Sequence, residues 1–121
     1  MKTILAVDDS ASIRQMVNIT LAAAGYQVVE AGNGAEGLGK LTSAGPVSMV
    51  VTDLNMPVMD GLTFIRELRK LPAGKGIPVL FLTTESDAGI KQQAKEAGAT
   101  GWITKPFQRE QLVAVVKKVL G

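Results

Sequence analysis

Hydrophobic residues along the chain alternate between two periods. Short runs rich in β-branched and other apolar residues occur at about residues 3–7, 26–30, 47–52, 77–82 and 101–104. In the segments between them, apolar residues recur every three or four positions, which is typical of a helix with one buried face. The pattern therefore predicts a (βα)5 order, in which five strands alternate with five helices.

Capping residues mark the ends of the predicted helices. The capping-box spacing occurs at Ser12 with Gln15 and again at Asn33 with Glu36. Glycine predicts the end of three helices, at Gly25, Gly45 and Gly98. The third and fourth strand runs are mostly apolar, as expected of parallel strands covered by helices on both faces.

Two of the helices are predicted to be weak. The second contains Gly37 and Gly39, and each glycine costs about 1 kcal/mol relative to alanine in a helix interior. The fourth, at about 86–97, offers the core only a small apolar face, made of Ile90, Ala94 and Ala97. Elements with few buried contacts have low local stability, and moving segments are drawn from that class.

Composition limits the kind of protein. The 121 residues are 46% hydrophobic, enough for one core, and 13 Lys and Arg against 11 Asp and Glu give a formal charge of +2. So small a charge does not favour nucleic acid or an anionic membrane as a partner. We expect no signal peptide, and no apolar run reaches the about 20 residues that a membrane-spanning helix needs. We expect one domain over 1–121 with no output domain, monomeric and cytoplasmic.

Five polar side chains follow the predicted strands. Asp8 and Asp9 come after the first strand, Asp53 after the third, Thr83 after the fourth and Lys105 after the fifth. The carboxyl ends of parallel strands meet at one edge of a sheet, which is where open α/β sheets bind ligands. Three acids, a hydroxyl and an ammonium at this edge indicate metal-assisted phosphoryl chemistry.

The charge of these side chains favours a divalent cation. Carboxylates about 5 Å apart repel by roughly 3 kcal/mol per pair at an effective dielectric constant near 20, and one lysine cannot balance three of them. Oxygen-only ligands favour Mg²⁺ or Mn²⁺ over zinc. The chain has no cysteine and no histidine, which excludes thiol chemistry, a Ser/His/Asp triad and a phosphohistidine on the chain itself. A phosphoryl acceptor would therefore be a carboxylate.

Four motifs resemble those of one known family. Residues 7–10 (Val-Asp-Asp-Ser), 53–61 (Asp-Leu-Asn-Met-Pro-Val-Met-Asp-Gly), 83–85 (Thr-Thr-Glu) and 105–107 (Lys-Pro-Phe) resemble the receiver domain of bacterial two-component response regulators. The resemblance covers about 3–120 and is nearest to the stand-alone, chemotaxis-type (CheY-like) regulators. It implies a flavodoxin-like, doubly wound parallel sheet of order 2-1-3-4-5.

The resemblance also implies a role for each site residue. Asp53 is the expected phosphoryl acceptor, attacking a phosphohistidine on a separate kinase. Asp9 and Asp53 are expected to bind Mg²⁺ through their side chains and Asn55 through its backbone carbonyl, while Asp8 holds a metal-bound water. Lys105 is expected to pair with the phosphoryl group as a point charge.

The resemblance implies that further residues take part in a conformational change that follows phosphorylation. Thr83 is expected to move and donate its hydroxyl to a phosphoryl oxygen, which lets the aromatic residue Trp102 turn inward and changes the surface of the fourth helix, fifth strand and fifth helix. Asn55 and Glu85 are expected to flank the water that attacks the aspartyl phosphate and so to tune dephosphorylation. A cis peptide is implied at Lys105-Pro106.

Two residues depart from the family pattern. Trp102 stands where Tyr or Phe is usual, and its indole is bulkier and lacks a phenol hydroxyl, so we expect a partial rotation or a larger pocket. Thr84 stands where a smaller residue is common and is expected to narrow access to the phosphoryl site.

Expected partners follow from the same resemblance. They are a CheA-like sensor histidine kinase upstream and, downstream, a protein such as a flagellar motor switch or a phosphotransfer protein. A phosphorelay intermediate or phosphate sink is the alternative. A Mg²⁺-dependent phosphatase with an aspartyl-phosphate intermediate is less favoured, because position 55 is Asn rather than a second acid and so short a chain leaves no room for a cap. We expect no turnover of a foreign substrate, and the acids disfavour a flavin phosphate.

Overall fold

Five parallel strands form one sheet in the order β2-β1-β3-β4-β5 in the computed structural model, which describes residues 2–120. The strands are β1 (Thr3–Val7), β2 (Gln27–Ala31), β3 (Met49–Thr52), β4 (Val79–Thr83) and β5 (Gly101–Thr104). The helices are α1 (Ala11–Ala23), α2 (Gly34–Ser43), α3 (Gly61–Lys70), α4 (Ala88–Glu96) and α5 (Arg109–Leu120), with a 3₁₀ helix, η1 (Pro72–Gly74). The predicted (βα)5 flavodoxin-like fold and its strand order are confirmed.

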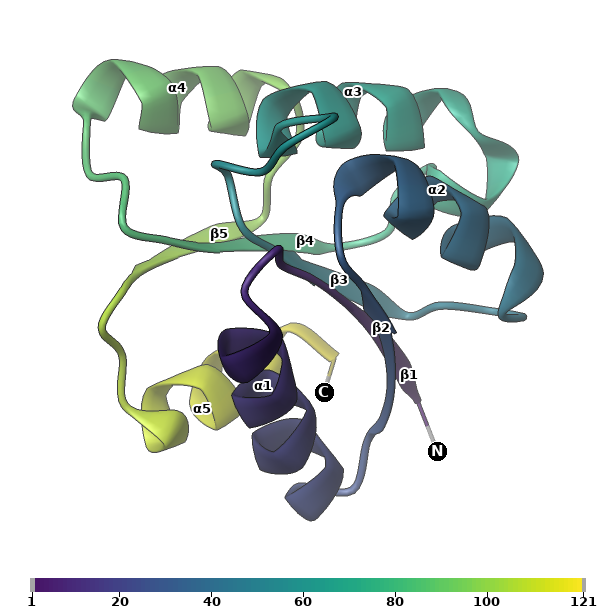
Figure 1. Ribbon diagram of the computed structural model, residues 1–121, viewed down its shortest axis with the longest axis vertical. Helices are drawn as coiled ribbons and strands as arrows, with labels where there is room; N and C mark the ends of the chain where they lie inside the picture. Colours follow the sequence, from purple (N-terminus) through teal and green to yellow (C-terminus); the bar gives the residue numbers. More distant parts are fainter. Residues whose placement is uncertain (1, 121) are drawn as a thin grey trace.

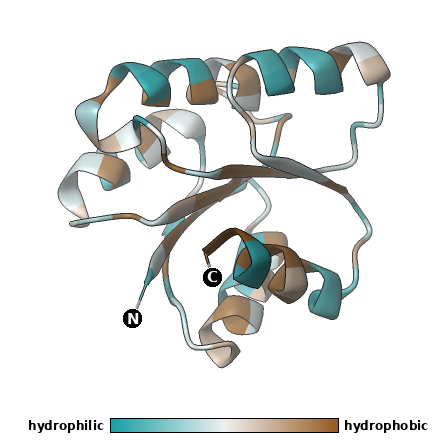
Figure 2. Ribbon diagram, turned by 180° about the vertical axis from the view of Figure 1, so that it is seen from behind, coloured by the Kyte–Doolittle hydropathy of each residue, from teal (hydrophilic) through white to brown (hydrophobic). Residues whose placement is uncertain are grey.

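Helices cover both faces of the sheet. Figure 1 shows α1 and α5 on one face and α2, α3 and α4 on the other. Because successive side chains of a strand point to opposite faces, Leu5 and Val7 pack with Phe64 of α3, whereas Ile4 and Ala6 pack with the α1 and α5 residues of a second cluster. The three inner strands, β1, β3 and β4, are almost entirely buried, and the middle of the sheet is correspondingly hydrophobic in Figure 2.

One predicted helix cap is confirmed and one is wrong. Asn33 caps α2, since its side chain accepts a hydrogen bond from the Glu36 backbone N–H at 2.9 Å. The cap of α1 is Ser10 and not Ser12, because Ser10 has the extended backbone of a cap and its Oγ accepts from Ile13 N–H, while Ser12 already lies inside the first turn. The three predicted terminal glycines all have positive φ, between 80° and 102°.

The two helices that were predicted to be weak differ in the structure. In α4 only Ala94 is fully buried, which agrees with a small apolar face. In α2, Gly37 is itself a packing residue, because a Cβ there would lie 3.0 Å from the Phe64 ring. Gly39 faces open space and remains a weak point of the helix.

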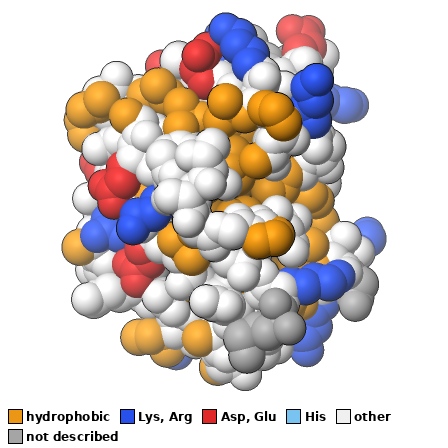
Figure 3. Space-filling view, turned by 90° about the vertical axis from the view of Figure 1, so that its right-hand side faces the viewer, with side chains coloured by type: hydrophobic (Ala, Val, Ile, Leu, Met, Phe, Trp, Pro, Cys, Tyr) orange, Lys and Arg blue, Asp and Glu red, His pale blue; other side chains and the backbone are white. Residues whose placement is uncertain are grey.

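The described surface carries charges of both signs. On the face in Figure 3, basic side chains lie at several separate places, with acidic ones between some of them. Within residues 2–120, none of the helices combines the length and the apolar character needed to cross a bilayer.

One buried hydroxyl gives a test of the packing between α1 and α5. The Oγ1 atom of Thr20 in α1 is buried and has no hydrogen-bond partner within the described residues. Because an unsatisfied buried hydroxyl is costly, we expect Thr20→Val to raise the free energy of unfolding by about 1 kcal/mol. Urea denaturation measures the change. The exposed Thr63→Val in α3 is the control and is expected to change stability by less than about 0.5 kcal/mol; equal effects of the two substitutions would contradict this packing.

Candidate phosphoryl-acceptor site

The register of the sheet brings the predicted residues together. Val7 of β1 lies opposite Thr52 of β3, so Asp8 and Asp53, which follow them, are neighbours. The ladder continues one residue past the strands, because Asp53 N–H donates to the Val7 carbonyl at 2.9 Å. At the other side of the site, Lys105 N–H donates to the Thr83 carbonyl at 2.8 Å. The site is therefore an extension of the sheet rather than a set of independent loops.

Three carboxylates form a compact oxygen cluster at this edge. One oxygen each from Asp8, Asp9 and Asp53 lies within 4.8 Å of the others. Asp8 and Asp53 are only 4% and 8% exposed, whereas Asp9 is exposed. This set of hard oxygen donors fits Mg²⁺ or Mn²⁺, and the open side at Asp9 leaves room for water or substrate oxygens.

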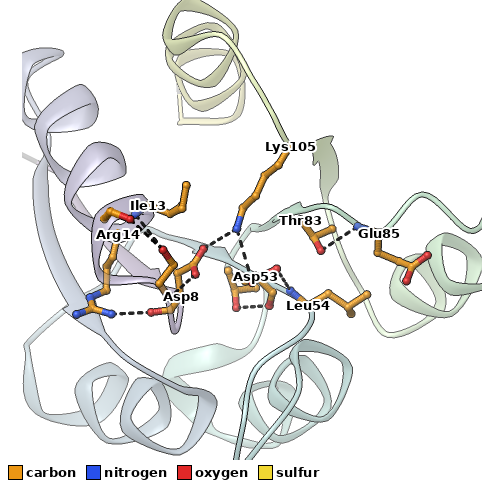
Figure 4. Close-up of polar contacts among 11 residues, drawn as sticks. Asp8, Ile13, Arg14, Asp53, Leu54, Thr83, Glu85 and Lys105 are labelled. Atoms are coloured by element: carbon orange, nitrogen blue, oxygen red, sulfur yellow. Dashed lines mark hydrogen bonds and ion pairs between the residues drawn. The ribbon is translucent and has the colours of Figure 1, made fainter.

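Lys105 provides the counter-charge in this structure. Its Nζ lies 2.9 Å from Asp8 Oδ2 and 3.6 Å from Asp53 Oδ2, and its side chain is 13% exposed (Figure 4). Burial raises the pKa of Asp8 above its ordinary value, although Lys105 and the Ser10 backbone N–H lower it. Burial of the ionised Asp8 therefore has an energetic cost that its two partners offset only in part.

Asp53 is oriented by its own loop. Its Oδ1 accepts from the Leu54 backbone N–H at 2.7 Å, which leaves Oδ2 facing Lys105. The next helix, α3, begins against this loop: Gly61 N–H donates to the Leu54 carbonyl at 2.7 Å. A Cβ at Gly61 would lie 2.5 Å from the Asp53 carbonyl oxygen, so only glycine permits this close approach.

Thr83 and Trp102 are joined through Glu85. The buried Thr83 hydroxyl accepts from Glu85 N–H at 3.2 Å, and the Glu85 carbonyl accepts from Trp102 Nε1 at 3.2 Å (Figure 4 shows the first contact). Trp102 is half-buried, with its ring centroid 5.6 Å from that of Phe81 and the Lys91 ammonium 5.7 Å from its ring. The indole N–H thus supplies a hydrogen-bond donor even though the residue lacks a phenol hydroxyl.

The remaining predicted residues lie around the same edge. Asn55 and Glu85 line one hollow of about 150 Å³, so they face a common space. The role of the Asn55 carbonyl as a ligand stays a prediction. Thr84 is exposed. The Lys105-Pro106 peptide is cis, as the resemblance implied.

Three residues near this edge were assigned no structural role from the sequence, although Val58 and Gly61 both lie within the 53–61 motif. Gly61 carried a weak signal, a glycine directly after the helix cap Asp60. Val58 carried none: it is 83% exposed and has a φ of 70°, an unusual backbone for a β-branched residue that costs about 1–3 kcal/mol. Arg14 was also unrecognised, because its contacts to Asp8 and Glu30 depend on the packing of α1 beside β2.

Comparison with known proteins places this geometry in a family. Residues 4–117 match the family described as the response regulator receiver domain. The chain is 36% identical over 119 residues to chemotaxis protein CheY1 of Helicobacter pylori, covering 98% of this chain and 96% of that protein.

Solved structures give the same result. Chemotaxis protein CheY4 of Vibrio cholerae has a TM-score of 0.94 and 46% sequence identity, with 99% of each chain covered. The receiver domain of sensor histidine kinase PA1611 from Pseudomonas aeruginosa, described as having a magnesium ion coordinated in the active site cleft, has a TM-score of 0.90 and 25% identity, covering 99% of this chain and 98% of that one.

The close approach at Gly61 gives a paired test. We expect Gly61→Ala to lower the free energy of unfolding by about 2 kcal/mol, because the added methyl group overlaps the Asp53 carbonyl. Gly39→Ala in α2 is the matched control, and it should instead stabilise the protein by about 1 kcal/mol since nothing lies near the new methyl group. Chemical denaturation measures both. A Gly61→Ala protein as stable as Gly39→Ala would show that the loop after Asp53 is not held as described.

Proposed function

Because this chain belongs to the response regulator receiver domain family, we propose that Asp53 accepts a phosphoryl group from a phosphohistidine of a sensor histidine kinase. The observation that carries the proposal is the position of Asp53, a buried carboxylate between two further acids and a lysine. The chain has no histidine, so the donor is another molecule. The reaction forms a bond from an Asp53 oxygen to phosphorus and breaks the bond from phosphorus to the donor nitrogen.

Asp8, Asp9 and Asp53 are proposed to hold Mg²⁺, which Mn²⁺ can replace. Their oxygens lie close enough together to share one ion, and the similar PA1611 receiver is described with magnesium in its cleft. When bound, Mg²⁺ neutralises the charge of the acceptor and of the phosphoryl oxygens. Asn55 is proposed to add its backbone carbonyl, and Asp8 to hold a metal-bound water.

Lys105 is proposed to bind the transferred phosphoryl group. Its ammonium already lies 3.6 Å from Asp53 Oδ2, so a group attached to Asp53 comes within its reach after a small movement away from Asp8. The low exposure of this side chain strengthens the ion pair relative to one in open solvent.

The signal is proposed to pass from Thr83 to Trp102. The Thr83 hydroxyl now accepts from Glu85 and keeps its own hydrogen to donate to a phosphoryl oxygen. A move of Thr83 toward Asp53 removes the acceptor of Glu85 N–H and frees the segment whose carbonyl holds the Trp102 indole. Helix α4 has a small apolar face, so few buried contacts oppose its displacement when Thr83 and Trp102 move.

The α4, β5 and α5 surface is the proposed output surface. A hollow of about 230 Å³ between α4 and β5 is lined by Trp102 and Lys91, so a change at Trp102 alters its shape. The CheY relatives are of nearly the same length as this chain, and we propose that it acts as a single domain through protein contacts in the cytoplasm, binding a flagellar motor switch or phosphotransfer protein.

Two other functions are weighed against this one. A phosphorelay intermediate or phosphate sink uses the same chemistry and differs only in the partner, which a pull-down against a motor switch protein and a histidine phosphotransfer protein would distinguish. A phosphatase acting on a foreign substrate is disfavoured because position 55 supplies an amide where such enzymes have a second acid. We propose that the chain catalyses only its own phosphorylation and dephosphorylation, with Asn55 and Glu85 tuning the latter.

Trp102 is the only tryptophan, and its indole is linked to Thr83 of the site through Glu85. We expect its fluorescence to change when Mg²⁺ is added and to change again with beryllofluoride, an analogue of the phosphoryl group. Asp53→Asn should remove the second change, because the analogue attaches to the acceptor carboxylate.

Glu67→Gln, an acid on the outer face of α3, is the matched control and should keep both changes. A beryllofluoride response that survives in Asp53→Asn would show that Asp53 is not the acceptor. A loss of both responses in Glu67→Gln would show that they report net charge rather than this site.

A further inference from the structure

The backbone of Asp8 is held from two sides. Its N–H donates to the Ala31 carbonyl of β2 at 3.1 Å, and its carbonyl accepts from Arg14 Nη1 at 2.7 Å. Figure 4 shows Arg14 on the α1 side of Asp8 and Lys105 on the other. Arg14 thus contacts the peptide group that joins Asp8 to Asp9, while Lys105 contacts the Asp8 carboxylate.

The Arg14 guanidinium is itself fixed by two residues. Its Nε donates to Glu30 Oε1 at 3.1 Å, and the other Glu30 oxygen accepts from Asn18 Nδ2 at 2.7 Å. The Arg14 and Glu30 side chains are 22% and 32% exposed, so both are partly shielded from water. These contacts connect α1, β2 and the loop after β1 in one network.

Helix α1 does not need this arginine for its own stability. Arg14 lies in the first turn of α1, where a cation is opposed by the positive end of the helix dipole, and that turn contains no acid. Arg14 is unfavourable for its own helix, and its hydrogen bonds go to Asp8 and Glu30. We therefore infer that it stabilises the loop after β1 rather than α1.

The Asp8–Asp9 peptide determines where Asp9 points. Within residues 2–120, no hydrogen bond or ion pair is found that holds the Asp9 carboxylate, although it is one of the three clustered acids. Its orientation therefore depends on the preceding peptide group, which Arg14 fixes.

We propose that Arg14, held by Glu30 and Asn18, is a positioning residue that orients Asp8 and Asp9 for Mg²⁺. This role rests on the proposed metal site. It means that residues outside the acidic cluster increase the affinity of that site for Mg²⁺. Outer partners that orient metal ligands typically change metal affinity by 10- to 100-fold when removed, and the partly exposed position of this network places it at the lower end of that range.

A simple charge effect predicts the opposite result for one variant. Arg14 is a cation beside an anionic site, so if it acted only through its charge, Arg14→Met would bind Mg²⁺ more tightly than wild type. If it acts by positioning, Arg14→Met binds Mg²⁺ more weakly. Arg14→Lys distinguishes the charge effect from positioning further. Lysine keeps the charge but cannot donate hydrogen bonds to Asp8 and Glu30 in the two directions that the planar guanidinium allows.

The experiment measures the Mg²⁺ dissociation constant by Trp102 fluorescence. We expect it to rise about 10-fold in Arg14→Met and to rise also in Arg14→Lys and Glu30→Gln. The double variant Arg14→Met with Glu30→Gln should bind no more weakly than Arg14→Met alone, since both act through one contact. Arg66→Met, which removes an exposed arginine of α3, is the control for lost charge and should bind as wild type does.

A metal-free measurement checks the same contact. In EDTA, the backbone amides of Asp8 and Ser10, which donate to the Ala31 carbonyl and to Asp8 Oδ1, should exchange with solvent hydrogen faster in Arg14→Met than in Arg66→Met, because the Asp8 backbone is no longer held from the α1 side. Unchanged exchange together with unchanged or tighter Mg²⁺ binding would overturn the positioning role alone. Absence of any Mg²⁺ response in wild type would overturn the metal site itself, and the positioning role with it.

Discussion

Electrostatic repulsion among three carboxylates is the constraint that the other residues of the site must compensate. With oxygens of Asp8, Asp9 and Asp53 within 4.8 Å of one another, each ionised pair repels by roughly 3 kcal/mol or more at an effective dielectric constant near 20. Lys105 compensates for part of this charge, and burial still raises the pKa of Asp8. The proposed Mg²⁺ would relieve this repulsion by adding positive charge among the three carboxylates.

The sheet is what holds these charges in place. Parallel pairing of β1 with β3 and of β4 with β5 fixes two pairs of site residues, and the hydrogen-bond ladder extends one residue past the strands to do so. The close packing of Gly61 against the Asp53 backbone, and the contact of Arg14 with the Asp8 backbone, hold the loops that lie beyond the ladder. The sheet sets these positions, whereas α4 is held by few buried contacts, with only Ala94 fully buried.

Much of this was predictable from the sequence, for physical reasons. Hydrophobic periodicity gave the five strands and five helices, and the rule that parallel strands end at one edge brought Asp8, Asp53, Thr83 and Lys105 together. The cap of α1 was misassigned because Ser10 and Ser12 are both plausible caps and only backbone geometry separates them. Arg14 could not be assigned because its partner Glu30 lies on another element, and such contacts follow from packing rather than from local pattern.

Phosphorylation of Asp53 is the property on which the proposed function depends. The most direct test is to treat the protein with acetyl phosphate in Mg²⁺, reduce the acyl phosphate with borohydride and locate the modified residue by mass spectrometry. We expect conversion of Asp53 to homoserine in Mg²⁺ and none in EDTA. Modification at another residue, or equal modification without the metal, would contradict it.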